Sequence, residues 1–538
     1  MPASRDEASI VGSEPFTRPD GASAEQNDSG NLILPSPLSD ETSGSDIHQA
    51  GQGDHGDRDA IEVRSVTVSI SAQLGARVIH LALNVISTLA IIRYMSPAGY
   101  GEFVIIVTVV TLARLISDFG LNPIAVREAS VEPAAEAELI GTVMAMRVGL
   151  ALIAMVIVQG ALLAVGAGAG VRTAGAVASL LLLAEAFITV VIMFQVRIRQ
   201  QYEALVLIAA ETVETGLVLW LIARQASLTA IVAAPAVGMT IGAVVAASLA
   251  VRRFDLSLGL DWSRARYLLR ESYPVAVAGF IGVLVFKTDS VMLAALRPPE
   301  DLGIYGAAYQ PVEYLLVGAV LLVGIPLPLL SRYYKTDAAK YRRIAQIGAD
   351  LILASMLPVA VFLAVASRPL VELFYGAGFT AAADPLRPLA AAMVIMAFTA
   401  WHVHALLAAG HQRITVRYNS AALVLAVALN ALLIPVFGYM GAALATLATV
   451  TVVLALVLGA TRRLAGLVVS VERVLRIAAA NGLFALALVG ATVAGAWLWL
   501  SVPLGLVVYA VALQAFGVTD LRSSARVLLG GSGTGRED

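Results

Sequence analysis

The sequence predicts an all-α polytopic membrane protein with about 14 transmembrane helices, arranged as two pseudo-symmetric six-helix lobes plus a C-terminal helix pair. Three observations support this fold class. Hydrophobic residues make up 59% of the chain and charged residues only 14%, against about 45–50% and about 25% in soluble domains. Apolar runs long enough to cross a bilayer recur along the chain, separated by short polar breaks. Lys and Arg gather in alternate breaks.

Residues 1–65 are predicted to form a disordered, acidic cytoplasmic tail. This segment is rich in Ser, Gly, Asp, Glu and Pro, and its 13 acidic residues face four arginines. It has too little apolar surface to offset the entropy cost of ordering. An apolar stretch after a basic start is missing, so the segment is not expected to be a signal peptide.

The apolar runs after the tail are expected to be helices, because lipid offers no partner to an unpaired backbone group. They are too long and too uniformly apolar for the alternating strands of a membrane barrel. The expected helices span residues 67–93, 102–126, 139–165, 173–195, 203–224, 228–250, 273–296, 303–331, 345–367, 384–408, 416–437, 440–460, 475–499 and 502–518.

Loop charge sets the expected orientation. With the N-terminal tail in the cytoplasm, the segments on that side hold 24 Lys and Arg residues counted from Arg58 onward, and the loops on the opposite side hold 6. This bias follows the positive-inside rule. Both termini are therefore expected to be cytoplasmic.

The basic break after the sixth run divides the chain. Residues 251–272 mix leucines and aromatic residues with arginines, which is typical of an amphipathic helix on the cytoplasmic membrane surface; a plain basic loop is the alternative. The expected domains are an N-terminal lobe (66–250), this linker (251–272), a C-terminal lobe (273–460), helices 13 and 14 (461–518) and a cytoplasmic tail (519–538).

A short motif occurs once in each expected lobe. Pro97-Ala-Gly-Tyr-Gly101-Glu-Phe follows the first helix, and Pro299-Glu-Asp-Leu-Gly303-Ile-Tyr follows the seventh. The shift of 303 − 101 = 202 residues corresponds to six helices. Two six-helix halves of the same orientation are a recurrent plan among transporters, so an internal duplication is expected.

Charged side chains inside the apolar runs are the candidate functional residues, because a charge at membrane depth costs roughly 2.5–3.5 kcal/mol and usually lines a polar path. Arg114 and Asp118 are four residues apart and could form a structural pair. Glu211 and Glu214 are three apart. Two carboxylates this close in a low dielectric cannot both ionise easily, which suits a proton site, although a pair facing the membrane interface is an equal alternative.

Lys287 and Asp289 are two residues apart and therefore point about 200° apart around their helix. A salt bridge between them is disfavoured. Lys287 is expected to face a cavity or an acid of another helix, and the partner of Asp289 is left open. Arg77, near the start of the first helix, could instead extend to the membrane interface.

Several function classes are excluded by missing motifs. The chain has no cysteine, no P-loop, no Ser/His/Asp set and no histidine spacing of a metal site. No enzymatic activity, cofactor, metal or nucleic-acid partner is expected. The class of function that remains is a secondary transporter or a flippase.

Four stretches resemble the Wzx-type lipid-linked oligosaccharide flippases of the multidrug/oligosaccharidyl-lipid/polysaccharide (MOP) superfamily. The resemblance covers about residues 66–460, and its motifs lie in the same order and at similar spacing. They are Tyr94–Gly101 (YMSPAGYG), Lys287–Tyr309 with its KTD and GIYGAAY segments, Leu373–Phe379 (LFYGAGF) and Asn430–Ala443 (NALLIPVFGYMGAA).

This resemblance implies two six-helix lobes around a central cationic cavity. It implies alternating-access transport, across the inner membrane, of a polyprenyl-pyrophosphate-linked glycan whose lipid tail stays in the membrane lipid. A polysaccharide polymerase and glycosyltransferases are further candidate partners. Alternatives are a lipid II flippase of MurJ type, a cation-coupled multidrug antiporter of MATE type, and a scaffold for glycan assembly without transport of its own.

A pyrophosphate needs Arg or Lys in a water-filled path. The candidate headgroup ligands are Arg77, Arg114, Arg147 and Lys287. The candidate residues for coupling to a proton or sodium gradient are Asp118, Glu211, Glu214 and Asp289.

Overall fold

The computed structural model describes residues 75–518, except 133–134, 198–199, 252–258, 325 and 494–497. The two expected tails, 1–65 and 519–538, lie outside the described residues. All described elements belong to one compact unit, Val63–Asp538, and throughout the described ranges the elements are helices without strands. After the helix Gly75–Tyr94 they are α2 (Pro97–Asp118), α3 (Leu121–Val131), α4 (Glu136–Ala164), α5 (Ala169–Ala178), α6 (Leu180–Phe187), η2 (Ile188–Val191), α7 (Ile192–Val196), α8 (Gln200–Ala223), α9 (Leu228–Val251), α10 (Trp262–Leu296), α11 (Pro299–Gly324), α12 (Leu327–Thr336), α13 (Ala338–Val365), α14 (Ser367–Tyr375), η3 (Ala377–Ala382), α15 (Ala383–Ala408), α16 (Gln412–Ala465), α17 (Val471–Val493) and α18 (Leu498–Ala515).

The all-helical membrane fold predicted from composition is confirmed. Within the described ranges, 11 helices are long and apolar enough to cross a membrane. This number differs from the expected 14 partly because α16 joins two expected runs, 416–437 and 440–460, into one element of 54 residues. Gly438, with φ 56° and ψ −133°, breaks the helical geometry where the two runs meet. α18 is a shorter apolar helix.

Two expected helices are interrupted. The run 102–126 is divided where Phe119 and Gly120 both adopt positive φ between α2 and α3. A Cβ on Gly120 would lie 3.0 Å from the backbone nitrogen of Ala276 in α10, so this break brings the two chain segments close together. The run 173–195 is divided into α5, α6, the 3₁₀ turn η2 and α7.

Residues 262–272, the second part of the predicted linker 251–272, are helical and continue directly into the following apolar run. α10 begins at Trp262 and continues without interruption to Leu296 as 35 helical residues. Its start is fixed by Asp261, whose side chain accepts hydrogen bonds from the backbone N–H groups of Ser263 and Arg264. A carboxylate at this position satisfies N–H groups that have no partner within the helix. The helix is therefore longer than the apolar run that it contains.

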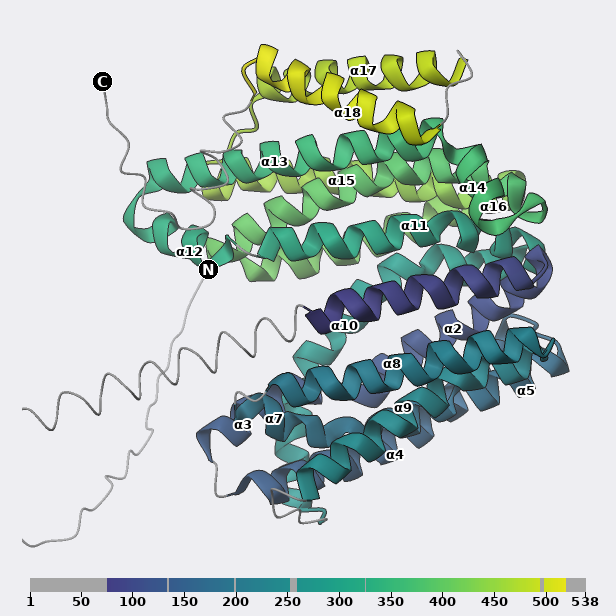
Figure 1. Cartoon of the computed structure of the whole chain (residues 1–538). Helices are drawn as coiled ribbons and strands as arrows, with labels where there is room; N and C mark the ends of the chain where they lie inside the picture. The colour runs from purple at the N-terminus through teal and green to yellow at the C-terminus, as the bar shows by residue number, and fades with distance from the viewer. Residues whose placement is uncertain are drawn as a thin grey trace, which may run out of the picture. The chain divides into compact units, whose positions relative to one another are not determined.

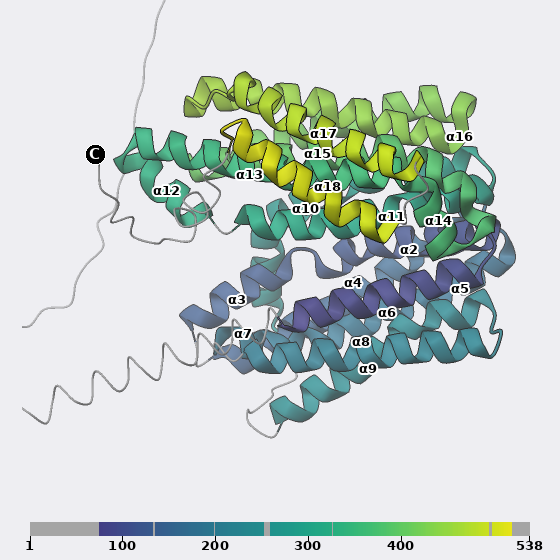
Figure 2. The ribbon, with the colours of Figure 1, turned by 45° about the horizontal axis from the view of Figure 1, so that its top comes forward.

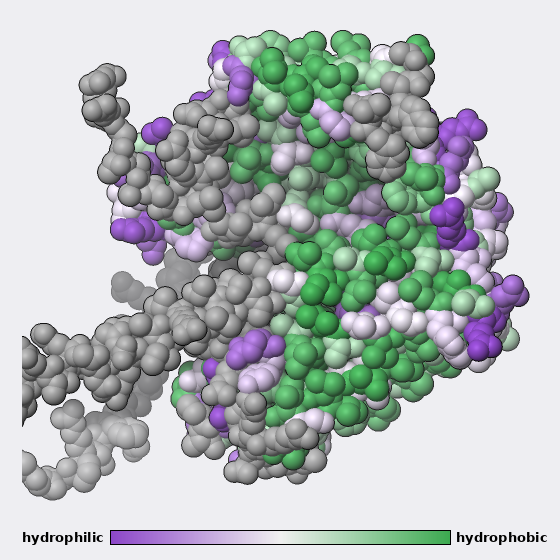
Figure 3. Space-filling view, viewed as in Figure 1, coloured by the Kyte–Doolittle hydropathy of each residue, from purple (hydrophilic) through white to green (hydrophobic). Residues whose placement is uncertain are grey.

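Helices of the C-terminal half lie together, drawn in teal to yellow, and helices α3 to α9 of the N-terminal half lie together, drawn in blue to teal (Figure 1). Contacts between the two groups involve α2, which packs against both α10 and α11. α17 and α18 pack on each other, and α17 also packs on α13 (Figure 2). Apolar side chains cover the flanks of the helices, and hydrophilic ones gather at their ends (Figure 3).

The two copies of the Pro-Gly motif meet in space. A Cβ on Gly101 would lie 1.7 Å from the carbonyl oxygen of Pro299, and a Cβ on Gly303 would lie 1.8 Å from that of Pro97. Each glycine therefore allows the first turn of one helix to touch the first turn of the other. This reciprocal contact holds the starts of α2 and α11 together.

Candidate functional site

Two arginines of the N-terminal half are held by acids on neighbouring helices. Arg114 on α2 forms an ion pair with Glu185 on α6 at 2.7 Å. Arg147 on α4 forms an ion pair with Asp118 on α2 at 3.3 Å, and it donates a hydrogen bond to the Thr189 hydroxyl at 3.0 Å. The considered pair of Arg114 with Asp118 is therefore not formed, because each residue finds a partner on another helix.

The exposure of these groups is unequal. The side chain of Arg114 is 56% exposed, whereas that of Glu185 is 5% exposed. Arg147 is mostly enclosed, and its Nε has no hydrogen-bond partner in the part of the chain that is described. Arg114 is thus the cation of this network that a ligand can reach, and Glu185 is a buried counter-charge behind it.

A second cluster joins the first membrane helix to α8. The Nδ1 of His80 lies 2.8 Å from a carboxylate oxygen of Glu211. Glu214 packs against Gly238 of α9, where a Cβ would lie 2.9 Å from the Cβ of Glu214. The two glutamates predicted as a carboxylate pair thus have different surroundings. Arg77 is exposed on the first helix.

The first helix also contacts the C-terminal half. The hydroxyl of Tyr314 on α11 lies 2.7 Å from Oδ1 of Asn84 and 2.7 Å from Oγ1 of Thr88. His80 and Asn84, both on the first helix, therefore contact different helices, α8 and α11.

Lys287 faces an acid of another helix, as expected. Its Nζ lies 3.1 Å from Oε1 of Glu313 on α11 and 5.9 Å from the ring centre of Tyr309. The Lys287 side chain is 19% exposed and that of Glu313 is 43% exposed. This pair is a second place where a partly accessible cation is balanced by a single carboxylate.

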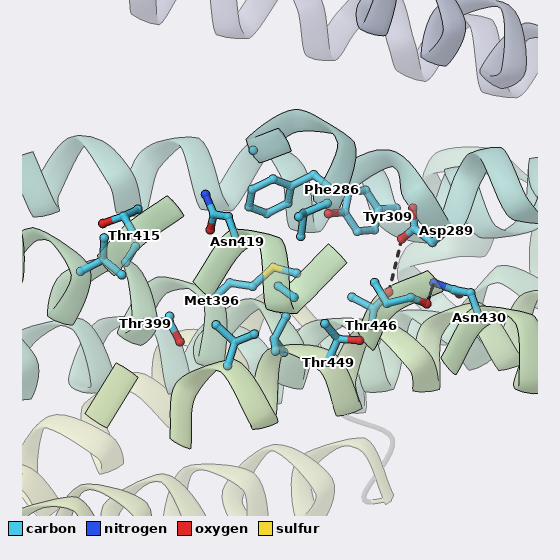
Figure 4. Close-up of a pocket in the computed structure, with 18 of the residues that line it drawn as sticks. Phe286, Asp289, Tyr309, Met396, Thr399, Thr415, Asn419, Asn430, Thr446 and Thr449 are labelled. Carbon is cyan, nitrogen blue, oxygen red and sulfur yellow. Dashed lines mark hydrogen bonds between the residues drawn. The ribbon is translucent and has the colours of Figure 1, made fainter. Parts of the chain in front are cut away.

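Asp289 points to the other side of α10, into a cavity of about 270 Å³ between α10, α11, α15 and α16 (Figure 4). It accepts hydrogen bonds from the hydroxyl of Tyr305 and from the backbone N–H of Ser290. The hydroxyl of Thr446 donates to it at 3.3 Å. The partner that the sequence left open is therefore a set of hydroxyl and amide donors.

The Asp289 cavity contains further oxygen atoms. Asn430 and Thr449 line it and are buried, and Oδ1 of Asn430 and Oγ1 of Thr449 have no hydrogen-bond partner among the described residues. Asn430 donates through its Nδ2 to the carbonyl of Ala426 at 2.9 Å. Buried polar atoms normally have partners, so two unpaired oxygens near a buried carboxylate indicate room for a water, a proton or a small cation.

The structure brings Arg114, Asp118 and Arg147 into one network with Glu185, and it places Glu211 beside His80 and Lys287 beside Glu313. Asp289 belongs to none of these ion pairs and is bound by the Tyr305 and Thr446 hydroxyls instead. The sequence pattern assigned no role to Glu185, Glu313 or Asn430. Thr189, Thr446 and Thr449 were missed. The sequence gives only a weak indication of a role for these three threonines, since hydroxyl side chains are common in membrane helices.

The comparisons with known proteins agree with this architecture. Residues 63–334, just over half of the chain, match the family described as polysaccharide biosynthesis protein. No curated protein matches the sequence.

Among solved structures, "Lipid II flippase MurJ, inward closed conformation" is similar, with a TM-score of 0.67 and 12% identity over 84% of this chain and 98% of that chain. A multidrug resistance MATE family transporter of the MOP superfamily in an inward-facing conformation has a TM-score of 0.61, with 13% identity over 72% of this chain and 94% of that chain. The outward-facing conformation of a MATE transporter has a TM-score of 0.52, with 14% identity over 74% of this chain and 96% of that chain. The chain therefore belongs to the polysaccharide biosynthesis protein family and is a multi-pass membrane protein with the fold of the MOP-superfamily transporters.

Proposed function

We propose that the chain is a flippase that moves a polyprenyl-pyrophosphate-linked oligosaccharide across the inner membrane for the synthesis of a cell-surface polysaccharide. Its two lobes, residues 66–250 and 273–460, alternate in opening to either side, and both termini are cytoplasmic. The family membership and the fold support this class of function. A polymerase and glycosyltransferases are the partners that such a substrate requires.

One observation carries the proposal: two partly accessible cations at membrane depth are each held by a single carboxylate. These are Arg114 with Glu185 and Lys287 with Glu313. A pyrophosphate presents several anionic oxygens and forms charge-assisted hydrogen bonds with Arg and Lys. It can therefore take the place of the carboxylate at either cation.

This exchange gives a physical reason for release as well as for binding. When the pyrophosphate leaves, the carboxylate forms its ion pair again, so the cation is never left alone in a low-dielectric path. While the pyrophosphate is bound, Glu185, which is 5% exposed, has lost its cation, and an uncompensated buried charge costs about 3–5 kcal/mol. The carboxylates therefore keep the site from holding its substrate too tightly. Arg147 and Arg77 are the further candidate ligands.

The Asp289 cavity is the coupling site that the geometry favours. Asp118 and Glu211 already have basic partners at 3.3 Å and 2.8 Å. Among the described residues, Asp289 has only hydroxyl and amide donors, and the oxygens of Asn430 and Thr449, which have no partner there, line the same cavity. A sodium ion prefers oxygen ligands of this kind, and a buried carboxylate without a basic partner also suits a proton.

The test is complementation of a strain that lacks its own oligosaccharide flippase, with Arg114→Ala, Arg147→Ala and Lys287→Ala as variants. Each variant is expected to reduce polymer export at equal protein level. Arg224→Ala is the matched control, because this arginine is exposed and contacts the ring of Trp220. Full export by all three variants would refute the cationic path.

Lipid II is a second candidate substrate, favoured by the fold shared with the MurJ structure over 84% of this chain, against 72% for the inward-facing MATE structure. Rescue of a strain depleted of its lipid II flippase, without rescue of polysaccharide export, would assign that substrate. Resistance to cationic drugs on expression, without a polysaccharide phenotype, would favour an antiporter. Failure to move labelled lipid-linked sugar in liposomes would favour a scaffold.

A further inference from the structure

A second, larger cavity lies where the C-terminal helix pair meets the rest of the chain. Its volume is about 610 Å³. It is enclosed by the first turns of α13, the segment 466–469 after α16, the start of α17 and residues 517–518 after α18. α17 and α13 pack on each other beside it (Figure 2). None of the candidate residues for transport lines this cavity.

The cavity is positively charged. Arg342 and Arg343 on α13 line it, are exposed, and have no ion pair or side-chain hydrogen bond to any described residue. Arg473 on α17 lines it from the opposite side and binds Asp350 at 2.8 Å. Gln346 also donates a hydrogen bond to Asp350 at 2.7 Å, so the Asp350 carboxylate already has partners for both of its oxygens. The guanidinium groups of Arg342 and Arg343 are therefore without a counter-charge among the described residues and can bind an anion.

The inner wall of the cavity carries a buried polar group. His402 lines the cavity with only 3% of its surface exposed, and its Nδ1 lies 2.9 Å from the carbonyl oxygen of Phe398. A carbonyl only accepts hydrogen bonds, so Nδ1 carries a proton, and Nε2 of an uncharged ring can accept one hydrogen bond. A ligand with a hydroxyl group beside its anionic group can supply that bond where it reaches Nε2.

The lip of the cavity is apolar. Val468 is part of the lining and is 66% exposed, and Val471 and Leu475 follow on α17 with 68% and 62% exposed. These residues belong to or adjoin a helix that is apolar enough to cross a membrane. A ligand held by the arginines would therefore lie beside a surface that suits hydrocarbon chains.

We propose that this cavity binds the phosphodiester headgroup of an anionic phospholipid with a free hydroxyl, such as phosphatidylglycerol. Arg342 and Arg343 bind the phosphate from α13, Arg473 approaches it from α17, and the acyl chains lie along Val471 and Leu475. Basic pockets between membrane helices are suited to phospholipid headgroups. The lipid thereby links α17 to the core of the fold.

The experiment measures lipid binding to the delipidated full-length protein by native mass spectrometry during titration with phosphatidylglycerol or phosphatidylcholine. The wild type is expected to bind one phosphatidylglycerol in preference to phosphatidylcholine. The R342Q/R343Q variant is expected to bind it at least about tenfold more weakly, because two charge-assisted hydrogen bonds are lost. The R342K/R343K variant, which keeps the charge, is expected to retain most of the preference.

The matched control is R462Q/R463Q, which removes two exposed arginines at the end of α16 that do not line the cavity. It is expected to leave the preferred lipid bound. If R342Q/R343Q and R462Q/R463Q lose phosphatidylglycerol binding equally, the lipid is attracted to the positive surface in general, and the proposal is overturned. Equal binding of the two lipids by the wild type would also overturn it. Displacement by soluble glycerol phosphate or inorganic pyrophosphate at the lipid's own concentration would assign the cavity to a free anion instead.

Discussion

The close approach of α2 and α11 at Gly101 and Gly303 leads to a specific prediction about the conformation of the protein. Replacing either glycine by alanine adds one methyl group where the helix starts of α2 and α11 touch. The added Cβ would lie 1.7 Å or 1.8 Å from a backbone carbonyl oxygen, that of Pro299 or Pro97. An ordinary contact is at 3.4 Å or more, so the two helix starts must separate by about 1.7 Å in Gly101→Ala and by about 1.6 Å in Gly303→Ala.

The free-energy cost of either substitution depends on which atoms would have to move. The clashing atoms are backbone atoms of helix starts, which cannot rotate away as a side chain does. Overpacking of this kind typically costs about 1–3 kcal/mol. This range corresponds to a change of about 5- to 150-fold in an equilibrium between conformations with the contact closed and open. Gly303→Ala is therefore expected to populate conformations in which these helix starts are apart.

Distance measurement by electron paramagnetic resonance checks this expectation. The chain has no cysteine, so spin labels attached to introduced cysteines at Arg93 and Glu300 report without background. Both residues are exposed and lie next to the contact. Gly303→Ala is expected to shift the distance distribution to longer values. Gly99→Ala is the control, because its nearest neighbour, a side-chain oxygen of Ser96, is at an ordinary 3.4 Å.

The reasoning would be refuted by an unchanged distance distribution together with an unchanged unfolding temperature in Gly303→Ala. An equal shift in Gly99→Ala would also contradict it, because the effect would then come from added helix propensity and not from the clash. The double variant Gly101→Ala/Gly303→Ala is expected to add little to either single change, since one separation relieves both contacts.

Three further predictions concern single side chains. Tyr305→Phe removes the hydroxyl that donates to Asp289 and is expected to alter the dependence of export on sodium or proton gradient; an unchanged dependence in liposomes would contradict a coupling role. Gly348→Ala places a Cβ 1.9 Å from a buried indole ring and is expected to lower the unfolding temperature by several degrees, measured by scanning fluorimetry; equal temperatures would show that the ring can move. The hydroxyl and backbone N–H of Ser263 hold the pKa of the Asp261 carboxyl below its usual value, so this cap stabilises the protein above the ordinary pKa of Asp and is lost as pH falls through the lowered pKa. The difference in unfolding temperature between wild type and Asp261→Ala is therefore expected to shrink on acidification, and a constant difference would exclude this linkage.

Hydrophobic pattern alone predicted the fold class, because crossing a bilayer demands about 20 apolar residues in a row and leaves a helix as the simplest way to satisfy the backbone. It did not predict the interruptions. The break at Phe119 and Gly120 and the 3₁₀ turn at 188–191 lie inside apolar runs, and apolar composition is the same on both sides of a break. The predicted helix 273–296 was shorter than α10, because the first turns of α10 are polar and hydropathy does not reveal them. They are nevertheless helical, with Asp261 as the N-cap.

The sequence by itself determined which residues could be functional, because charges inside membrane helices are rare and costly. It also indicated, from the helical angle alone, that a salt bridge between Lys287 and Asp289 is disfavoured. Only the tertiary structure decided their actual partners, Glu313 for Lys287 and the Tyr305 and Thr446 hydroxyls for Asp289. The physical reason is that the period of a helix specifies the direction of each side chain, whereas the neighbour in that direction depends on how distant helices pack.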